Sequence, residues 1–132
     1  MAKDKYTAIF KGGNRIDITD GKFTFQTDVP KEPGAKVEAP KPFGLFLASI
    51  ASCAAYYSLL FLNQRNLPTE GLAVETIVEQ DDKTKMVGKI EVNITPPKGL
   101  PEKYRASLVA AAEACLVKKH LDTPPEIITR LV

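Results

Sequence analysis

The longest uncharged stretch of this chain, residues 42–64, limits most strictly what the chain can fold into. It holds 23 consecutive residues without Asp, Glu, Lys or Arg, starts at Pro42 and ends shortly before Leu67-Pro68. Proline is favoured in the first turn of a helix, and the residue before a proline disfavours helical geometry. The pattern therefore predicts a long central helix over residues 43–65.

A helix without a polar face either crosses a membrane or is buried on all sides. Three serines, two tyrosines and a cysteine interrupt this run, and the flanking segments are patterned as sheets, so we favour burial and expect no membrane partner. One sheet covers only one side of a helix, and a second copy of the chain is expected to cover the other. The predicted homodimer would bring helices close together at small residues, namely Gly44, Ala48, Ala51, Ser52 and Ala55.

The segments around the central helix alternate in hydrophobicity, as strands do. Residues 1–28 predict a β-meander with a hairpin turn at Asp20-Gly21, and residues 29–42, with four prolines, predict a connecting loop. Residues 72–95 predict a β-hairpin, residues 101–121 a second helix and residues 126–132 a final strand. The expected fold is α+β, a single domain over residues 1–132 with two antiparallel sheets around long helices.

The charge of the chain is nearly balanced, with 18 Lys and Arg against 16 Asp and Glu and a net charge of +2. The basic residues are scattered, which argues against a nucleic-acid partner. The N-terminal residues show no secretory signal, so we expect a cytoplasmic location in which cysteines stay reduced.

Two cysteines, Cys53 and Cys115, lie 62 positions apart, each among alanines and other small residues. In the second helix, Tyr104, Leu108, Ala111 and Cys115 share one face at helical spacing, so Cys115 is expected to point inward. Facing residues of packed helices have Cα atoms about 4 to 6 Å apart, within the range for a disulfide. The alternative is that each cysteine is simply a small buried hydrophobic residue.

Three segments together resemble a known family: "PFGLFLASIASCAAYY", "NQRNLPTEGLAVE" and "AAAEACLVKKHL". They are similar to the OsmC/Ohr family of osmotically inducible and organic hydroperoxide resistance proteins. The resemblance spans nearly the whole chain and implies an intertwined α+β homodimer. It also implies an antioxidant thiol peroxidase of the stress response, acting on organic hydroperoxides.

The resemblance assigns Cys53 as the thiolate that attacks the peroxide and Cys115 as the thiol that closes a disulfide with it. The reductant would be a dithiol, either a lipoyl group or a thioredoxin-like protein, and no cofactor is implied. In the family an arginine from the N-terminal hairpin stabilises the thiolate, and Arg15 is the best match. The positions that match the family glutamate hold Phe43 and Gly44, which leaves three carboxylates as substitutes, namely Asp17, Asp20 and Glu38.

Aromatic residues of the central helix could hold the apolar part of a substrate, and the candidates are Phe43, Phe46, Tyr56 and Tyr57. Their alternative role is in the core. A second possible function follows from the missing glutamate, namely a dimer of the same fold that binds a small apolar ligand near Cys53 without catalysis. The lone histidine, His120, lies at a helix end beside two lysines, and no metal site is expected.

Overall fold

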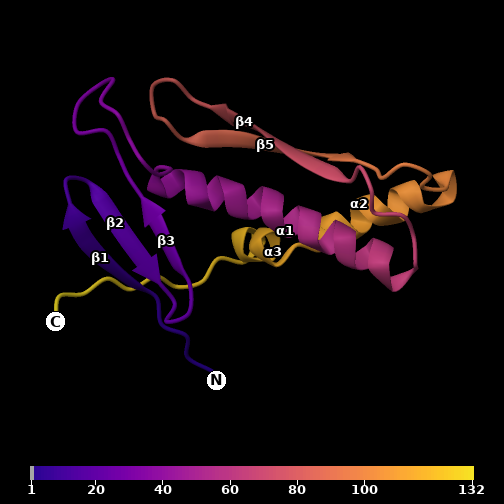
Figure 1. Ribbon diagram of the computed structural model, residues 1–132, viewed down its shortest axis with the longest axis horizontal. Coiled ribbons are helices and arrows are strands. Elements are labelled where there is room, and N and C mark those ends of the chain that lie inside the picture. Colours follow the sequence, from indigo (N-terminus) through magenta and orange to yellow (C-terminus); the bar gives the residue numbers. More distant parts are fainter. Residues whose placement is uncertain (1) are drawn as a thin grey trace. The chain divides into compact units, whose positions relative to one another are not determined.

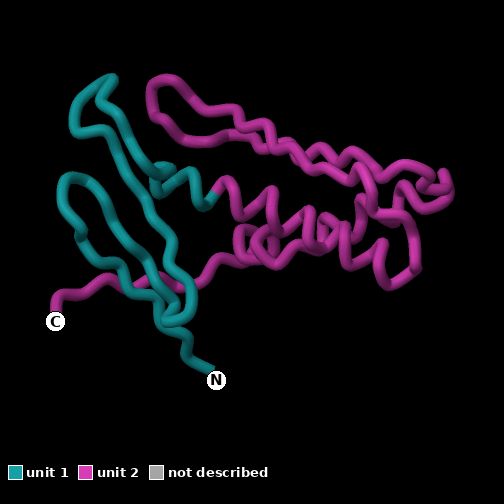
Figure 2. Tube along the Cα trace, in the orientation of Figure 1, with its two compact units in different colours: residues 1–46 teal, residues 47–132 magenta. Residues whose placement is uncertain are grey.

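The computed structural model describes residues 2–132. The chain divides into two compact units, residues 1–46 and residues 47–132 (Figure 2). The two units contain two small antiparallel sheets and a set of helices, so the predicted α+β class is confirmed (Figure 1).

The first unit contains a three-stranded antiparallel sheet in the order β1-β2-β3, formed by β1 (Thr7–Gly12), β2 (Arg15–Thr19) and β3 (Thr24–Thr27). These strands correspond to the predicted meander. Gly12 and Gly13 both have positive φ, which lets the chain reverse between β1 and β2. At the next turn the Asp20 carboxylate accepts the N–H groups of Lys22 and Phe23.

Helix α1 (Pro42–Gln64) begins at the predicted proline. At its C-terminus Asn66 adopts φ +52°, and the N–H of Leu67 bonds to the Leu62 carbonyl at 2.9 Å. This is a Schellman termination, in which a left-handed residue turns the chain off the helix axis. The Arg65 guanidinium lies 3.9 Å from the centre of the Phe61 ring and covers this end of the helix.

In the second unit, β4 (Ala73–Gln80) and β5 (Val87–Thr95) form the predicted antiparallel hairpin. Half-buried and exposed residues alternate along β4, as expected for a sheet with one packed face. At the turn the Asp81 carboxylate accepts the N–H groups of Lys83 and Thr84.

The second helix, predicted as one piece over residues 101–121, is interrupted. It consists of the 3₁₀ turn η1 (Glu102–Tyr104), α2 (Arg105–Glu113) and α3 (Leu116–Asp122). Cys115 has φ −51° and ψ 128°, an extended conformation that stops α2 and starts α3. The apolar periodicity continues across the break, and it therefore gave no sign of the single extended residue.

Residues 126–132, predicted as a final strand, form no regular secondary structure. A strand needs a neighbouring strand for its N–H and C=O groups, and no strand among residues 2–132 pairs with this segment. Its apolar side chains are largely exposed, with Ile127 at 84% and Leu131 at 100%. Five strands are thus described, one fewer than the sequence predicts.

The core of the second unit joins α1, the hairpin and α2. Its centre is formed by Phe61, Leu62 and Leu108. Leu72, which directly precedes β4, and Ile94 of β5 pack against these residues. By length and composition alone α1 could span a membrane, but core helices of soluble proteins can be equally long and apolar. One face of α1 packs in the core described above. Within the single chain, 28% of the most apolar 18-residue segment of α1 is buried.

Candidate functional site

The two cysteines lie in the second unit on separate elements. Cys53 is in the middle of α1 and is half-buried, whereas Cys115 forms the junction between α2 and α3 and is only 2% exposed. Both are free thiols. The predicted inward position of Cys115 is confirmed by its burial and by that of Leu108, at 2% exposed, on the same face.

The break between α2 and α3 is built around Cys115. Its N–H bonds to the Ala112 carbonyl at 3.3 Å, which closes α2, and its carbonyl accepts the N–H of Lys119 at 3.0 Å, which opens α3. The residue is therefore bonded into both helices through its backbone. These bonds fix the direction of the Cα–Cβ bond of Cys115, because that direction can change only if α2 or α3 moves.

The sulfurs of Cys53 and Cys115 are within hydrogen-bonding contact. Burial is the main cause that raises the pKa of the Cys115 thiol, and the hydrogen bond with Cys53 raises it further. The N–H groups of Val117 and Lys118 act in the opposite direction, although no side-chain capping hydrogen bond is formed at this helix start. The raised pKa favours the thiol form of Cys115 over the thiolate.

The two thiols therefore differ in accessibility. Cys53 is the more exposed thiol, while Cys115 is buried, and its burial raises its pKa. A pair in this contact can be oxidised to a disulfide if the sulfurs move to a separation of about 2.05 Å. The predicted meeting of two sulfurs from distant segments is thus present in the fold.

A pocket of about 240 Å³ lies beside Cys115. Its walls come from α1, β5 and α3, and its lining is mostly apolar. The residues are Ile50, Ala54, Ile90, Val92, Cys115, Lys118, Leu121 and Asp122. This pocket could not be predicted from the sequence, because its walls come from three separate segments that share no sequence motif.

The aromatic residues proposed for substrate binding form two local pairs on α1. The rings of Phe43 and Phe46 stack with centroids 5.4 Å apart, and Tyr56 and Tyr57 meet edge to face at 5.4 Å. None of these four residues lines the pocket beside Cys115. Phe43 and Tyr56 are exposed, at 41% and 58%.

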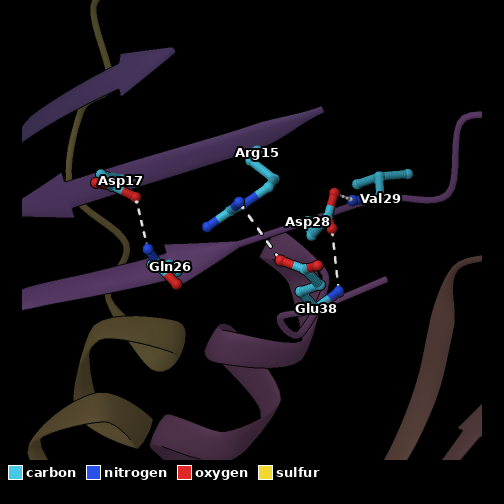
Figure 3. Close-up of polar contacts among 6 residues, drawn as sticks. All are labelled: Arg15, Asp17, Gln26, Asp28, Val29 and Glu38. Carbon is cyan, nitrogen blue, oxygen red and sulfur yellow. Dashed lines mark hydrogen bonds and ion pairs between the residues drawn. The ribbon is translucent and has the colours of Figure 1, made fainter. Parts of the chain in front are cut away.

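Arg15 lies in the first unit, at the start of β2, and forms an ion pair with Glu38. The Arg15 Nη1 is 3.4 Å from Glu38 Oε2, and Figure 3 shows the two side chains pointing toward one another. Glu38 is one of the three carboxylates that the sequence predicts as substitutes for the family glutamate. The other two are engaged elsewhere, because Asp17 accepts from Gln26 at 3.1 Å and Asp20 closes its own turn.

The loop that carries Glu38 is anchored by Asp28, which the sequence analysis did not single out. Asp28 is 8% exposed, and its two carboxylate oxygens accept the N–H groups of Val29, at 2.9 Å, and Glu38, at 3.1 Å (Figure 3). Its own N–H bonds to the Pro40 carbonyl at 3.0 Å. A buried carboxylate with these partners holds the backbone of Glu38 in place beside Arg15.

No group of three or more metal-binding side chains occurs among residues 2–132. The Nδ1 of His120 is 2.8 Å from the Leu116 carbonyl one turn earlier in α3, and its side chain is exposed. This contact is local to the helix, as expected for a residue near a helix end.

Residues 33–130 match the family described as OsmC-like protein. No curated protein sequence matches the chain. Several solved structures are similar. A protein of Psychrobacter arcticus 273-4, assigned to the osmotic stress and detoxification response, has a TM-score of 0.75 and 21% identity, covering 90% of this chain and 88% of that chain.

Two further solved structures share the fold. An OsmC-like protein from Mycoplasma pneumoniae has a TM-score of 0.74 at 13% identity, covering 93% of this chain and 89% of that chain. The organic hydroperoxide resistance protein OhrB of Bacillus subtilis has a TM-score of 0.58 at 25% identity, covering 93% of both chains.

Proposed function

Because this chain belongs to the OsmC-like protein family, we propose that it is a cytoplasmic thiol-dependent peroxidase that reduces organic hydroperoxides. The observation that carries the proposal is the hydrogen-bonding contact between Cys53 and Cys115. The likeness to a hydroperoxide resistance protein at 25% identity supports the same substrate class.

In the proposed reaction, the Cys53 thiolate attacks the outer oxygen of the hydroperoxide. An S–O bond forms, the O–O bond breaks, and the alkoxide leaves and takes up a proton as the alcohol. The Cys115 sulfur then attacks the Cys53 sulfenic acid, so that the disulfide forms and water leaves. A lipoyl or thioredoxin-like dithiol reduces the disulfide and is itself oxidised to a disulfide.

The assignment of the two roles follows from accessibility. The attacking sulfur must meet a peroxide from solution and lose its proton, and Cys53 is the more exposed of the pair. Burial of Cys115 beside Cys53 suits the resolving role, in which the sulfur meets its neighbour and not a peroxide from solution. Phe43, Phe46, Tyr56 and Tyr57 are proposed to contact the apolar part of the hydroperoxide.

Arg15 is proposed as the cation that favours the Cys53 thiolate, with Glu38 in place of the family glutamate. The 3.4 Å ion pair supports the second part, because a carboxylate beside a guanidinium restricts its orientation. Replacing Arg15 with Met is expected to slow sulfenate formation at least about tenfold. Arg105→Met, which removes an exposed arginine of α2, is the matched control.

We also propose that the chain acts as a homodimer through α1. Between residues 44 and 63, the residues of α1 that stay exposed in the single chain share one face at helical spacing and carry no charge. They are Ala48, Ser52, Tyr56, Leu59, Leu60 and Asn63. An uncharged stripe of this length suits contact with another apolar surface, and a second copy of α1 provides one.

The test of the peroxidase is turnover of tert-butyl hydroperoxide with a dithiol, and titration of free thiols with stoichiometric peroxide. We expect the parent to lose two thiols, Cys115→Ser to lose one and form a sulfenic acid that dimedone traps, and Cys53→Ser to lose none. Ser52→Ala should behave as the parent. A Cys53→Ser variant with parental turnover would rule out the proposed nucleophile.

A second candidate function is the binding of a small apolar ligand without catalysis. The apolar pocket beside Cys115 and the absence of a carboxylate at Phe43 and Gly44 favour it. A fluorescent apolar probe such as 1-anilinonaphthalene-8-sulfonate should then bind saturably, and Ile90→Trp, which would fill the pocket, should abolish the signal. Thiols that survive stoichiometric peroxide, together with saturable probe binding, would favour this function over the peroxidase.

A further inference from the structure

A second pocket lies within the first unit, between the β1–β2 turn and the loop that follows β3. Its volume is about 470 Å³. Most of its lining is polar or charged, and the residues are Lys11, Gly12, Gly13, Asn14, Arg15, Asp28, Val29, Lys31, Ala35, Lys36 and Glu38. We propose that this pocket binds a doubly charged phosphoryl group. The proposal concerns residues 11–38 alone, and although Arg15 and Glu38 also belong to the proposed peroxidase site, the variants that test it replace neither residue.

The pocket is held open by hydrogen bonds between its two walls. The Asn14 Nδ2 donates to the Val29 carbonyl at 3.0 Å, which ties the hairpin turn to the loop. Asp28 fixes the loop from within through the N–H groups of Val29 and Glu38. Because these bonds are made without a ligand, a ligand would find the walls in place, and binding would cost little ordering of the chain.

The charges of the lining are unequal. Four cationic residues face two carboxylates, so the lining carries a net charge of +2, the same as the formal net charge of the whole chain. The formal charges of all other residues therefore sum to zero, and the lining of this pocket accounts for the net positive charge of the chain. A phosphoryl group carries about −1.5 to −2 at pH 7 and would neutralise that excess.

Both carboxylates and two of the four cations already have partners. Asp28 accepts backbone N–H groups, Glu38 pairs with Arg15 at 3.4 Å, and Lys11 lies 3.8 Å from Asp17. Among residues 2–132, neither Lys31 nor Lys36 forms an ion pair. Two ammonium groups are thus left to bind an anion that enters the pocket.

Gly13 allows Lys31 to lie against the hairpin turn. A Cβ at residue 13 would be 2.9 Å from the Lys31 Cε and 3.5 Å from its Nζ, closer than the lysine stem could tolerate without moving. The glycine also has φ +59°, which few other residues adopt. The end of the Lys31 side chain therefore lies against the turn at the pocket wall, and a side chain at residue 13 would require it to shift.

The proposal is tested by calorimetric titration of the full chain with inorganic phosphate, phenyl phosphate and benzoate, at constant ionic strength set with sodium chloride. We expect saturable binding of at least one phosphate compound and much weaker binding of benzoate, which carries one charge. Equal affinity for inorganic phosphate and phenyl phosphate would identify free phosphate as sufficient, whereas preference for phenyl phosphate would identify a phosphomonoester.

Variants locate the binding. Lys31→Ala and Lys36→Ala should each weaken phosphate binding about 3- to 10-fold, the range for one charge-assisted contact at a partly exposed site. Lys83→Ala removes the same charge from the β4–β5 turn and should leave affinity unchanged. Gly13→Ala, which only shifts the end of Lys31, should weaken binding less than Lys31→Ala does, and circular dichroism would show that each variant is folded.

Three results would overturn the proposal. These are the absence of saturable phosphate binding up to about 10 mM, benzoate affinity equal to that of phenyl phosphate, and a loss of affinity in Lys83→Ala as large as in Lys31→Ala. The two lysine variants lie in an exposed loop, so they keep the test decisive even if Gly13→Ala fails to fold.

Discussion

Cys115 and Cys53 are in hydrogen-bonding contact through their sulfurs, although the two residues lie 62 positions apart. The contact joins the middle of α1 to the junction between α2 and α3. Cys115 is almost fully buried, whereas Cys53 is half-buried, so Cys53 is the more accessible residue of the pair. This asymmetry is what a two-step thiol oxidation requires.

Oxidation of the pair should stabilise the fold. A disulfide between residues so distant in sequence removes loop entropy from the unfolded chain, an effect of about 4 kcal/mol for this loop length. Urea unfolding of the diamide-treated protein, with and without dithiothreitol, measures it. Cys115→Ser carried through the same treatment should show no gain, and an oxidised parent that unfolds at lower urea would contradict the expectation.

Alkaline pH should remove a stabilising contribution of Cys115. Its pKa in the folded protein is raised by burial and by the hydrogen bond with Cys53. The contribution is therefore fully present below the unfolded value of about 8.5 and is lost as the pH rises through the raised value. The difference in unfolding free energy between the parent and Cys115→Ser should shrink from pH 7 to pH 10, and a constant difference would contradict this.

Removal of the Asp28 carboxylate should loosen the loop that carries Glu38. Asp28→Ala leaves the N–H groups of Val29 and Glu38 without their acceptor, at a cost of about 0.5–1.5 kcal/mol for each hydrogen bond lost. Hydrogen exchange at these two amides should become faster in the variant. Asp82→Ala, in the β4–β5 turn, is the control and should leave both exchange rates unchanged.

Truncation of Leu62 should cost more than truncation of an exposed residue of the β4–β5 hairpin. Leu62 is 0% exposed at the centre of the core, so Leu62→Ala is expected to lower the unfolding free energy by about 2–5 kcal/mol. Met86→Ala, at 69% exposed, should change it by less than about 0.5 kcal/mol. Similar losses in urea unfolding would show that Leu62 is not a core residue.

A charge on the exposed face of α1 should dissociate the proposed homodimer. Leu59 is 39% exposed in the single chain, and in Leu59→Lys a charge would be buried in a contact between two helices. Sedimentation velocity should show a dimer for the parent and a monomer for the variant. Met86→Lys, which places the same charge on the hairpin, should stay dimeric, and a monomeric parent would refute the proposal.

Local signals in the sequence predicted the elements with distinct ends. Pro42 and the Leu67-Pro68 pair bounded α1, and Asp20-Gly21 marked a turn that the structure contains. These signals act over a few residues, since proline, glycine and aspartate restrict or bond to the backbone next to them. For the same reason the burial of Cys115 could be predicted from the spacing of one helix face.

Two predictions failed because they depended on contacts beyond the local segment. The break at Cys115 has no proline or glycine to mark it, and it follows from the backbone bonds that join α2 and α3 at that residue. Residues 126–132 have strand-like composition but no strand beside them in the single chain. A strand-like composition is not enough to form a strand, because the backbone N–H and C=O groups of a strand must bond to a neighbouring strand.

The sequence by itself determined the two sheets, the extent of α1 and which residues carry thiols, because periodicity and turn chemistry act between near neighbours in the chain. Only the tertiary structure decided that Cys115 meets Cys53, that Glu38 is the carboxylate beside Arg15, and that Lys31 and Lys36 line one pocket. Each of these depends on burial or on distances between segments far apart in sequence, and such distances exist only once the chain is folded.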